Sequence, residues 1–128
     1  MAEMNVELVA VEGPVWSGQA SSVIVRTVEG DIGVLPGHAP LLAQLKEGFS
    51  ARIILTGGEE ISVALHGGFL SVTKDRVSIL AEDAQLGSDI DVAQAQADYA
   101  EAQRHAEGMD SAELLRARAQ LLAAGHSV

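Results

Sequence analysis

The chain has 128 residues and a mass of 13.3 kDa, which fits one domain with a small appendage and argues against two full-size domains. Eighteen acidic residues against eight basic residues give a net charge of −10, which argues against nucleic acid or anionic lipid as a direct partner. Apolar residues make up 48% of the chain and aromatic residues 3%, so the core must consist mainly of aliphatic side chains.

Residues 1–87 have the pattern of β structure almost throughout. Apolar residues alternate along 6–11, which predicts a strand with one buried face. A β-branched run at 21–27, bounded by Gly18 and Gly30, predicts a second strand.

Two β-hairpins are predicted farther along the chain. Gly57 and Gly58 separate the strands of the first hairpin, and Lys74 and Asp75 separate those of the second. The four expected strands are 51–55, 61–65, 69–73 and 77–81.

The distribution of residue types predicts an α+β fold with a boundary near Gly87. Eleven of the 13 glycines lie in residues 1–87, whereas eleven of the 20 alanines lie in residues 88–128. Many short strands without a helical period between them favour an antiparallel β-sandwich or flattened barrel and argue against parallel βαβ units.

Two helices that form an antiparallel hairpin are expected after this boundary. Ser88 and Asp91 have the spacing of a capping box, and Asp110 and Glu113 repeat it. The first helix should begin at Ser88, run to about His105 and stop at Gly108, and the second should end at Gly125.

The hairpin is expected to pack weakly. Four buried leucines would contribute about 6–12 kcal/mol, while ordering each residue costs about 1–2 kcal/mol, so the hairpin should be able to leave the sandwich. The leucines are 114, 115, 121 and 122, and the alanines expected to allow close helix approach are 93, 97, 100, 102 and 106.

Residues typical of catalytic or metal sites are widely scattered. The four histidines, at 38, 66, 105 and 126, are at least 21 residues apart, and the chain contains no cysteine, so neither a metal nor a cofactor is expected. The paired carboxylates, such as Glu59 and Glu60, fit a solvated surface better than an active site. The N-terminus lacks the pattern of a secretory signal, and no apolar run is long enough to span a membrane.

The segment 29–42 combines glycines and prolines with four large apolar residues, at 34, 35, 41 and 42. It is compatible with two arrangements. An ordered loop would present these side chains to a partner, whereas a bulged pair of strands would bury them inside the sandwich.

Motifs in this segment and beyond it resemble a known family. The run G-x-x-G-x-x-P-G-H-x-P-L-L occupies 30–42, G-G-F-L-x-V occupies 67–72, and Ile90 and Asp91 stand at the expected start of the first helix. On these residues the chain resembles the epsilon subunit of F-type rotary ATP synthases over essentially its whole length.

This resemblance implies a sandwich of about ten strands, followed by a two-helix hairpin, in a subunit that catalyses nothing itself. The sandwich domain (1–87) would bind the gamma subunit and the ring of c subunits, with Asp31, Gly33 and His38 in the loop that faces the ring. The subunit would be peripheral, on the cytoplasmic side of the cell inner membrane, as part of the ATP synthase complex.

The resemblance also implies that the hairpin (88–128) folds against the sandwich or extends into the alpha/beta catalytic head, where it restrains ATP hydrolysis. The residues expected to make these regulatory contacts are Arg104, Leu114, Leu115, Arg116 and Arg118. Pairing of the arginines within the hairpin, with Asp98, Glu101 and Glu113, is the alternative.

Family members that bind ATP open the first helix with I-D-x-x-R-A. Here Ile90, Asp91 and Ala95 match, but Gln94 stands in place of the arginine, so tight ATP binding is not expected. A freestanding nucleotide or anion sensor, whose hairpin closes on its ligand, is the alternative function. It requires a concave site lined with cations, which the acidic sequence does not predict.

Overall fold

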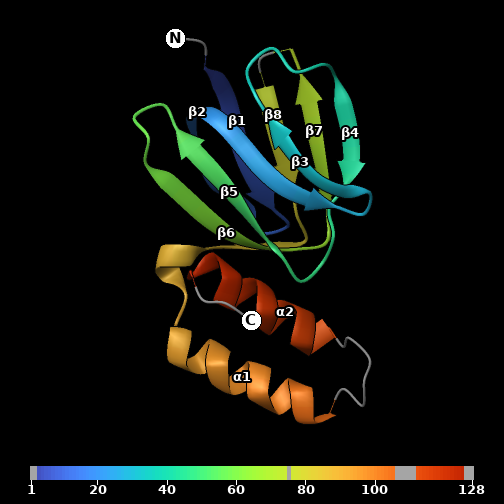
Figure 1. Cartoon of the computed structure of the whole chain (residues 1–128), viewed down its shortest axis with the longest axis vertical. Coiled ribbons are helices and arrows are strands. Elements are labelled where there is room, and N and C mark those ends of the chain that lie inside the picture. Colours follow the sequence, from blue (N-terminus) through green and yellow to red (C-terminus); the bar gives the residue numbers. More distant parts are fainter. Residues whose placement is uncertain (1–2, 75, 106–111, 126–128) are drawn as a thin grey trace.

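A computed structural model describes residues 3–74, 76–105 and 112–125 and shows a β domain followed by two helices (Figure 1). The described residues contain nine strands, one fewer than the ten or so implied by the family resemblance. The strands are β1 (Met4–Ala10), β2 (Gly13–Thr27), β3 (Gly30–Val34), β4 (Leu41–Gln44), β5 (Ser50–Leu55), β6 (Glu60–His66), β7 (Phe69–Thr73), β8 (Arg76–Leu80) and β9 (Asp83–Leu86).

The long strand β2 connects the two layers of the sandwich. Its first part, 13–20, pairs with β1, and its last part lies between β3 and β5. The strand order is therefore β4-β7-β8-β1-β2 in one layer and β3-β2-β5-β6-β9 in the other. Both predicted hairpins, β5–β6 and β7–β8, are confirmed, although Asp75 in the second turn lies outside the described residues.

One strand pair departs from the antiparallel expectation. β1 and β8 run parallel, with Val6 opposite Val77 and Leu8 opposite Ile79. The chain between them passes through both layers of the sandwich, so this pair needs no crossover helix and forms no βαβ unit.

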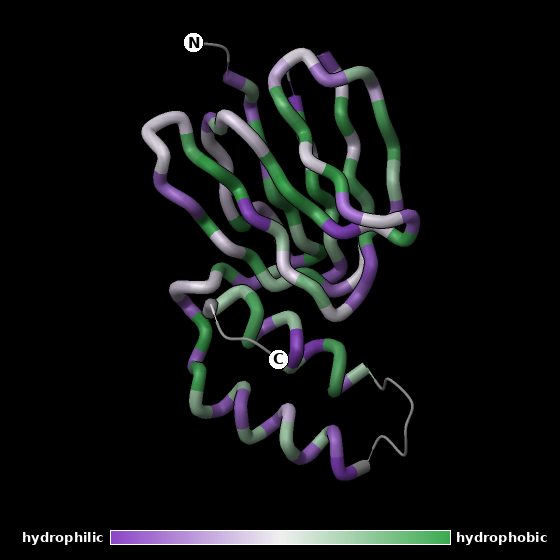
Figure 2. Tube along the Cα trace, viewed as in Figure 1, coloured by the Kyte–Doolittle hydropathy of each residue, from purple (hydrophilic) through white to green (hydrophobic). Residues whose placement is uncertain are grey.

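The sandwich core is aliphatic and follows the two-residue period. Val6, Leu8 and Ala10 on β1 are buried, as are Ala51 and Ile53 on β5. The largest completely buried side chains include Leu8, Ile53, Leu70 and Ile79. Figure 2 shows that hydrophobic residues recur along the strands. The inward positions predicted from alternation are thus confirmed.

Gly18 does not bound a strand, as the sequence had suggested, but lies inside β2. The indole of Trp16 covers it, and a Cβ at position 18 would lie 2.7 Å from that ring. Glycine is needed here because the aromatic ring approaches the backbone so closely, not because the chain turns.

The first helix begins four residues later than expected. Ser88 lies in a short 3₁₀ turn (Gly87–Asp89), and α1 covers Val92–His105. Asp91 caps α1, since its Oδ1 accepts a hydrogen bond of 3.1 Å from the backbone N–H of Gln94. The expected stop at Gly108 lies outside the described residues.

The second helix, α2, covers Ala112–Ala123. Its predicted end is confirmed, because Gly125 has a positive φ of 89° and its N–H donates to the carbonyl of Leu122. The expected capping residue Asp110 lies outside the described residues.

The hairpin is folded against the sandwich, with α2 between α1 and strands β5 and β6 (Figure 1). A second apolar cluster joins Ala64 of β6 to Ala95 of α1 and to Ala119 and Leu121 of α2. Among the α1 alanines expected to pack, Ala102 is buried, Ala93, Ala97 and Ala100 are exposed, and Ala106 lies outside the described residues. The packed face of α1 instead contains Val92, Ala95 and Tyr99. This face is buried because Val92 and Tyr99 are larger apolar side chains than the alanines on the other faces.

Candidate functional site

Asp31 and Gly33 lie two residues apart on β3, so they are on the same face, and both are exposed. Arg26 on β2 grips the Asp31 carboxylate with two hydrogen bonds, of 2.6 Å from Nε and 3.2 Å from Nη2. These hydrogen bonds hold the pKa of Asp31 below its usual range, with a smaller contribution from the charge of Arg26. Asp31 therefore presents a fixed, ionised carboxylate group.

His38 lies in the turn that follows β3. Its N–H donates to the carbonyl of Leu35 at 3.0 Å, and its ring Nδ1 lies 2.7 Å from the carbonyl oxygen of Ala39. Gly37 has a φ of 82°, a conformation that favours glycine and directs the chain back toward β4. The turn is therefore held by one backbone hydrogen bond and by the contact of the His38 ring with the backbone.

The four apolar side chains of this segment divide between the two expected arrangements. Val34 is completely buried and Leu41 is partly buried, whereas Leu35 and Leu42 are 62% and 72% exposed. The loop thus contributes to the core and also offers apolar surface for a partner.

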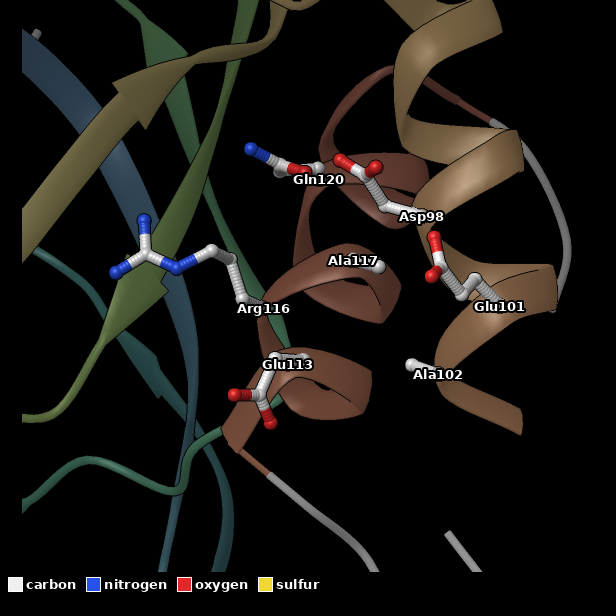
Figure 3. A pocket seen from close by; sticks show the side chains of 7 residues that line it. All are labelled: Asp98, Glu101, Ala102, Glu113, Arg116, Ala117 and Gln120. Atoms are coloured by element: carbon white, nitrogen blue, oxygen red, sulfur yellow. The ribbon is translucent and has the colours of Figure 1, made fainter. Parts of the chain in front are cut away.

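Arginines of α2 bind the sandwich rather than residues of their own helix. Arg116 Nη1 lies 2.6 Å from Asp83 Oδ2 on β9, and Arg118 Nε donates to the carbonyl of Gly48 at 2.9 Å. Gln120 on the same helix donates to Gln85 on β9. Pairing of Arg116 with Glu113 is therefore wrong for this conformation. Figure 3 shows the Arg116 side chain directed away from α1.

Phe49 forms an aromatic contact between the two parts of the molecule. The guanidinium of Arg118 lies 4.5 Å from the centre of the Phe49 ring, and that of Arg26 lies 4.2 Å from it. Because Arg26 also holds Asp31, one chain of contacts leads from β3 through Phe49 to α2.

Gly48 makes room for α2. A Cβ at this position would lie 2.5 Å from Arg118 Nη2 and 2.7 Å from Leu115 Cδ2, and its φ is 88°. Leu115 is partly buried and Leu114 is buried, while Arg104 near the end of α1 is exposed. We call the contacts of Arg116, Arg118 and Gln120 with the sandwich, together with the close approach at Gly48, the docking contacts.

Sequence reasoning missed the sandwich side of the docking contacts. Gly48, Phe49 and Asp83 all lie more than 30 residues from their helical partners. The short segment 46–49, between two strands, has no period from which such a contact could be inferred. Both phenylalanines of the chain follow a glycine, so the pair Gly48–Phe49 does not single out this segment in the sequence either.

A pocket of about 530 Å³ lies between the two helices (Figure 3). It is lined by Asp98, Glu101, Ala102, Glu113, Arg116, Ala117 and Gln120. Three carboxylates therefore face the pocket, and its arginine is paired with Asp83. This charge disfavours a nucleotide or another anion, so the geometry does not support the sensor alternative.

The residues of the nucleotide-like motif have structural roles here. Ile90 is buried in the apolar cluster between hairpin and sandwich, and Asp91 caps α1. Gln94 Nε2 donates to Asp98 Oδ1 at 2.8 Å on the same helix. The amide of Gln94 thus faces a carboxylate in this structure.

Within 3–74, 76–105 and 112–125, no three histidine or acidic residues come together in a way that could hold a metal ion. In the same part of the chain, neither helix combines the length and hydropathy that crossing a lipid bilayer requires.

Comparisons with known proteins agree with this geometry. Residues 3–87 match the family described as ATP synthase, Delta/Epsilon chain, beta-sandwich domain. An ATP synthase epsilon chain of Rhodococcus opacus is 58% identical over 101 residues, which cover 79% of this chain and 83% of the relative. One from Mycobacterium avium is 46% identical over 125 residues, 98% of each chain. A chain in the cryo-EM structure of the Euglena gracilis mitochondrial ATP synthase has a similar fold, with a TM-score of 0.74 and 24% identity, covering 94% of this chain and 76% of that one.

Proposed function

The chain belongs to the delta/epsilon family of ATP synthase subunits, and from this premise we propose that it is a non-catalytic rotor subunit that restrains ATP hydrolysis through its hairpin. The observation that carries the regulatory part is the docked hairpin, which reaches the sandwich mainly through α2. The subunit has no active site of its own in this proposal, and it works at the cytoplasmic side of the inner membrane.

The sandwich, residues 1–87, is proposed to bind the gamma subunit and the c ring. The fixed carboxylate of Asp31, the exposed backbone at Gly33 and the turn at His38 support a rigid surface for the polar loops of the ring. The exposed side chains of Leu35 and Leu42 add apolar area to that surface.

The hairpin, residues 88–128, is proposed to leave the sandwich and reach the alpha/beta head. On release, the guanidiniums of Arg116 and Arg118 lose Asp83 and Gly48, which frees them, with exposed Arg104, for acidic partners in the head. Leu114 and Leu115 would supply the apolar part of the same contact. The docked state therefore stores the proposed inhibitory surface against the sandwich.

Truncation after Gly87 tests both halves of the proposal in the assembled complex. The truncated subunit should still assemble with gamma and the c ring, because it retains the nine strands that the structure describes, and ATP hydrolysis by the complex should rise. Co-elution with gamma and steady-state hydrolysis are the two measurements.

Two outcomes would contradict the proposal in different ways. A truncated subunit that no longer assembles would show that the sandwich is not the binding domain. Equal hydrolysis with and without residues 88–128 would remove the regulatory role and leave the stalk role intact.

A further inference from the structure

A histidine lies beside the ion pair that holds the hairpin. His66, the last residue of β6, is opposite Asp83 in the β6–β9 register and is partly buried. Asp83 is also the partner of Arg116 on α2, at 2.6 Å. Two basic side chains, one on the sandwich and one on the hairpin, therefore stand beside a single carboxylate.

We propose that His66 is a proton-operated release for the docked hairpin: when its imidazole gains a proton, it competes with Arg116 for Asp83 and favours the undocked hairpin. This inference rests on the proposed regulatory function, because it assigns the signal that moves the hairpin.

The argument depends on which charges surround His66 in each state. β9 contributes Asp83, which is opposite His66. The turn before β9 contributes Glu82, whose backbone N–H donates to the His66 carbonyl at 3.1 Å. From α2 comes Arg116, with Glu113 one turn earlier. The segment before β5 contributes Lys46 and Glu47, which line a surface pocket together with Gly67, Glu82 and Arg118.

Undocking changes this balance in one direction. It removes the guanidinium of Arg116 and the burial provided by α2, while the Asp83 carboxylate on β9 stays opposite His66. An imidazolium is then more stable than in the docked state, where a positive charge opposes it. Acid must favour whichever state binds the proton more tightly, so it favours the undocked hairpin.

The pKa of His66 agrees with this direction. Burial, followed by the charge of Arg116, holds the pKa of His66 below its usual range in the docked state, and Asp83 opposes the shift. Docking is therefore strongest above the pKa of the undocked state and weakens as pH falls toward the lowered pKa. Between the two values, the ratio of undocked to docked molecules rises up to about tenfold per pH unit.

The test uses the full chain, which contains no cysteine and so accepts a specific dye pair. Val11→Cys, at a position 81% exposed, and Ala112→Cys, at the exposed start of α2, report docking by single-molecule energy transfer. The undocked-to-docked ratio should rise about three- to tenfold from about pH 8 to about pH 5.5, where histidine titrates.

Three variants make the result specific. His66→Gln should abolish the pH response, whereas the matched change His38→Gln, in the β3–β4 turn, should preserve it. Arg116→Gln, at an exposed side chain, should lower docking at high pH and reduce the pH response. A constant ratio in the parent chain, or an unchanged response in His66→Gln or Arg116→Gln, would overturn the proposal.

The outcome is separable from that of the truncation experiment. If truncation raises hydrolysis but the undocked-to-docked ratio does not depend on pH, the proposed role of His66 is wrong and the regulatory role of the hairpin stands. If the ratio depends on His66 but truncation leaves hydrolysis unchanged, the release exists and the regulatory role is wrong.

Discussion

The sandwich and the hairpin are stabilised in different ways. The sandwich has completely buried aliphatic side chains from both layers, including Leu8, Ile53 and Leu70. The cluster that joins the hairpin to it contains four alanines with Ile90 and Leu121, supplemented by exposed or partly exposed polar contacts. Because buried area sets most of the free energy, the sandwich should persist while the hairpin undocks.

The largest expected effect on this difference in stability comes from shortening a buried side chain in each region. Ile53→Ala should lower the free energy of unfolding of the sandwich by about 2–5 kcal/mol, since the side chain is completely buried. Leu121→Ala should mainly increase hydrogen exchange in the hairpin. Native-state hydrogen exchange resolves the two regions. If Leu121→Ala lowered protection from exchange in the sandwich as much as Ile53→Ala does, the two regions would unfold as one unit.

Gly48→Ala sharpens the comparison at the contact between the regions. The added Cβ would collide with the side chains of Arg118 and Leu115, and it must also adopt a φ of 88°. We expect the docked state to lose about 1–3 kcal/mol, read from the energy-transfer ratio.

Gly58→Ala is the matched control, because its φ is 94° but nothing lies within 4 Å of its added Cβ. It carries the same kind of backbone strain without the collision. If both variants undock the hairpin equally, the close approach of α2 at Gly48 has no role in docking.

Arg118→Gln should weaken docking by a smaller amount. It removes the hydrogen bond to the Gly48 carbonyl and the contact with the Phe49 ring, which together are worth about 1–2 kcal/mol. Arg104→Gln, on the exposed part of α1, serves as the control and should leave the docked fraction unchanged. An equal effect of both changes would point to the net charge of the hairpin rather than to these contacts.

Sequence alone predicted the parts of the fold that depend on local patterns. Alternation located the buried positions around Leu8 and Ile53, and a glycine correctly marked the end of α2 at Gly125. These features were predictable because each is encoded within a few neighbouring residues.

The contacts between distant segments were not predictable in this way. Arg118 and Gly48 are 70 residues apart, and only the folded chain brings them together. The parallel pairing of β1 with β8 and the cover of Gly18 by Trp16 depend on tertiary structure too. The site residues Asp31 and His38 were named from the family motif, and their roles at the c ring stay predictions.

The smallest expected effect concerns an ion pair inside one region. Arg26–Asp31 and Arg116–Asp83 are both 2.6 Å long and solvent-accessible, but only the second connects the sandwich to the hairpin. Arg26→Gln should raise the pKa of Asp31 back toward its ordinary value, as followed by carboxyl NMR titration. Arg52→Gln, which removes the exposed pair with Glu60, should leave that pKa unchanged.

The sign of this pH dependence follows from the lowered pKa of Asp31. The pair with Arg26 contributes to stability above the ordinary carboxyl pKa, and the contribution is lost as pH falls through the lowered value. Water screens both side chains, so the melting temperature should scarcely change. A large change would mean that Arg26 acts mainly through the Phe49 ring, 4.2 Å away, and hence through the boundary with α2. If Arg26→Gln changes the pKa of Asp31 but not the docked fraction of the hairpin, this ion pair acts within the sandwich alone.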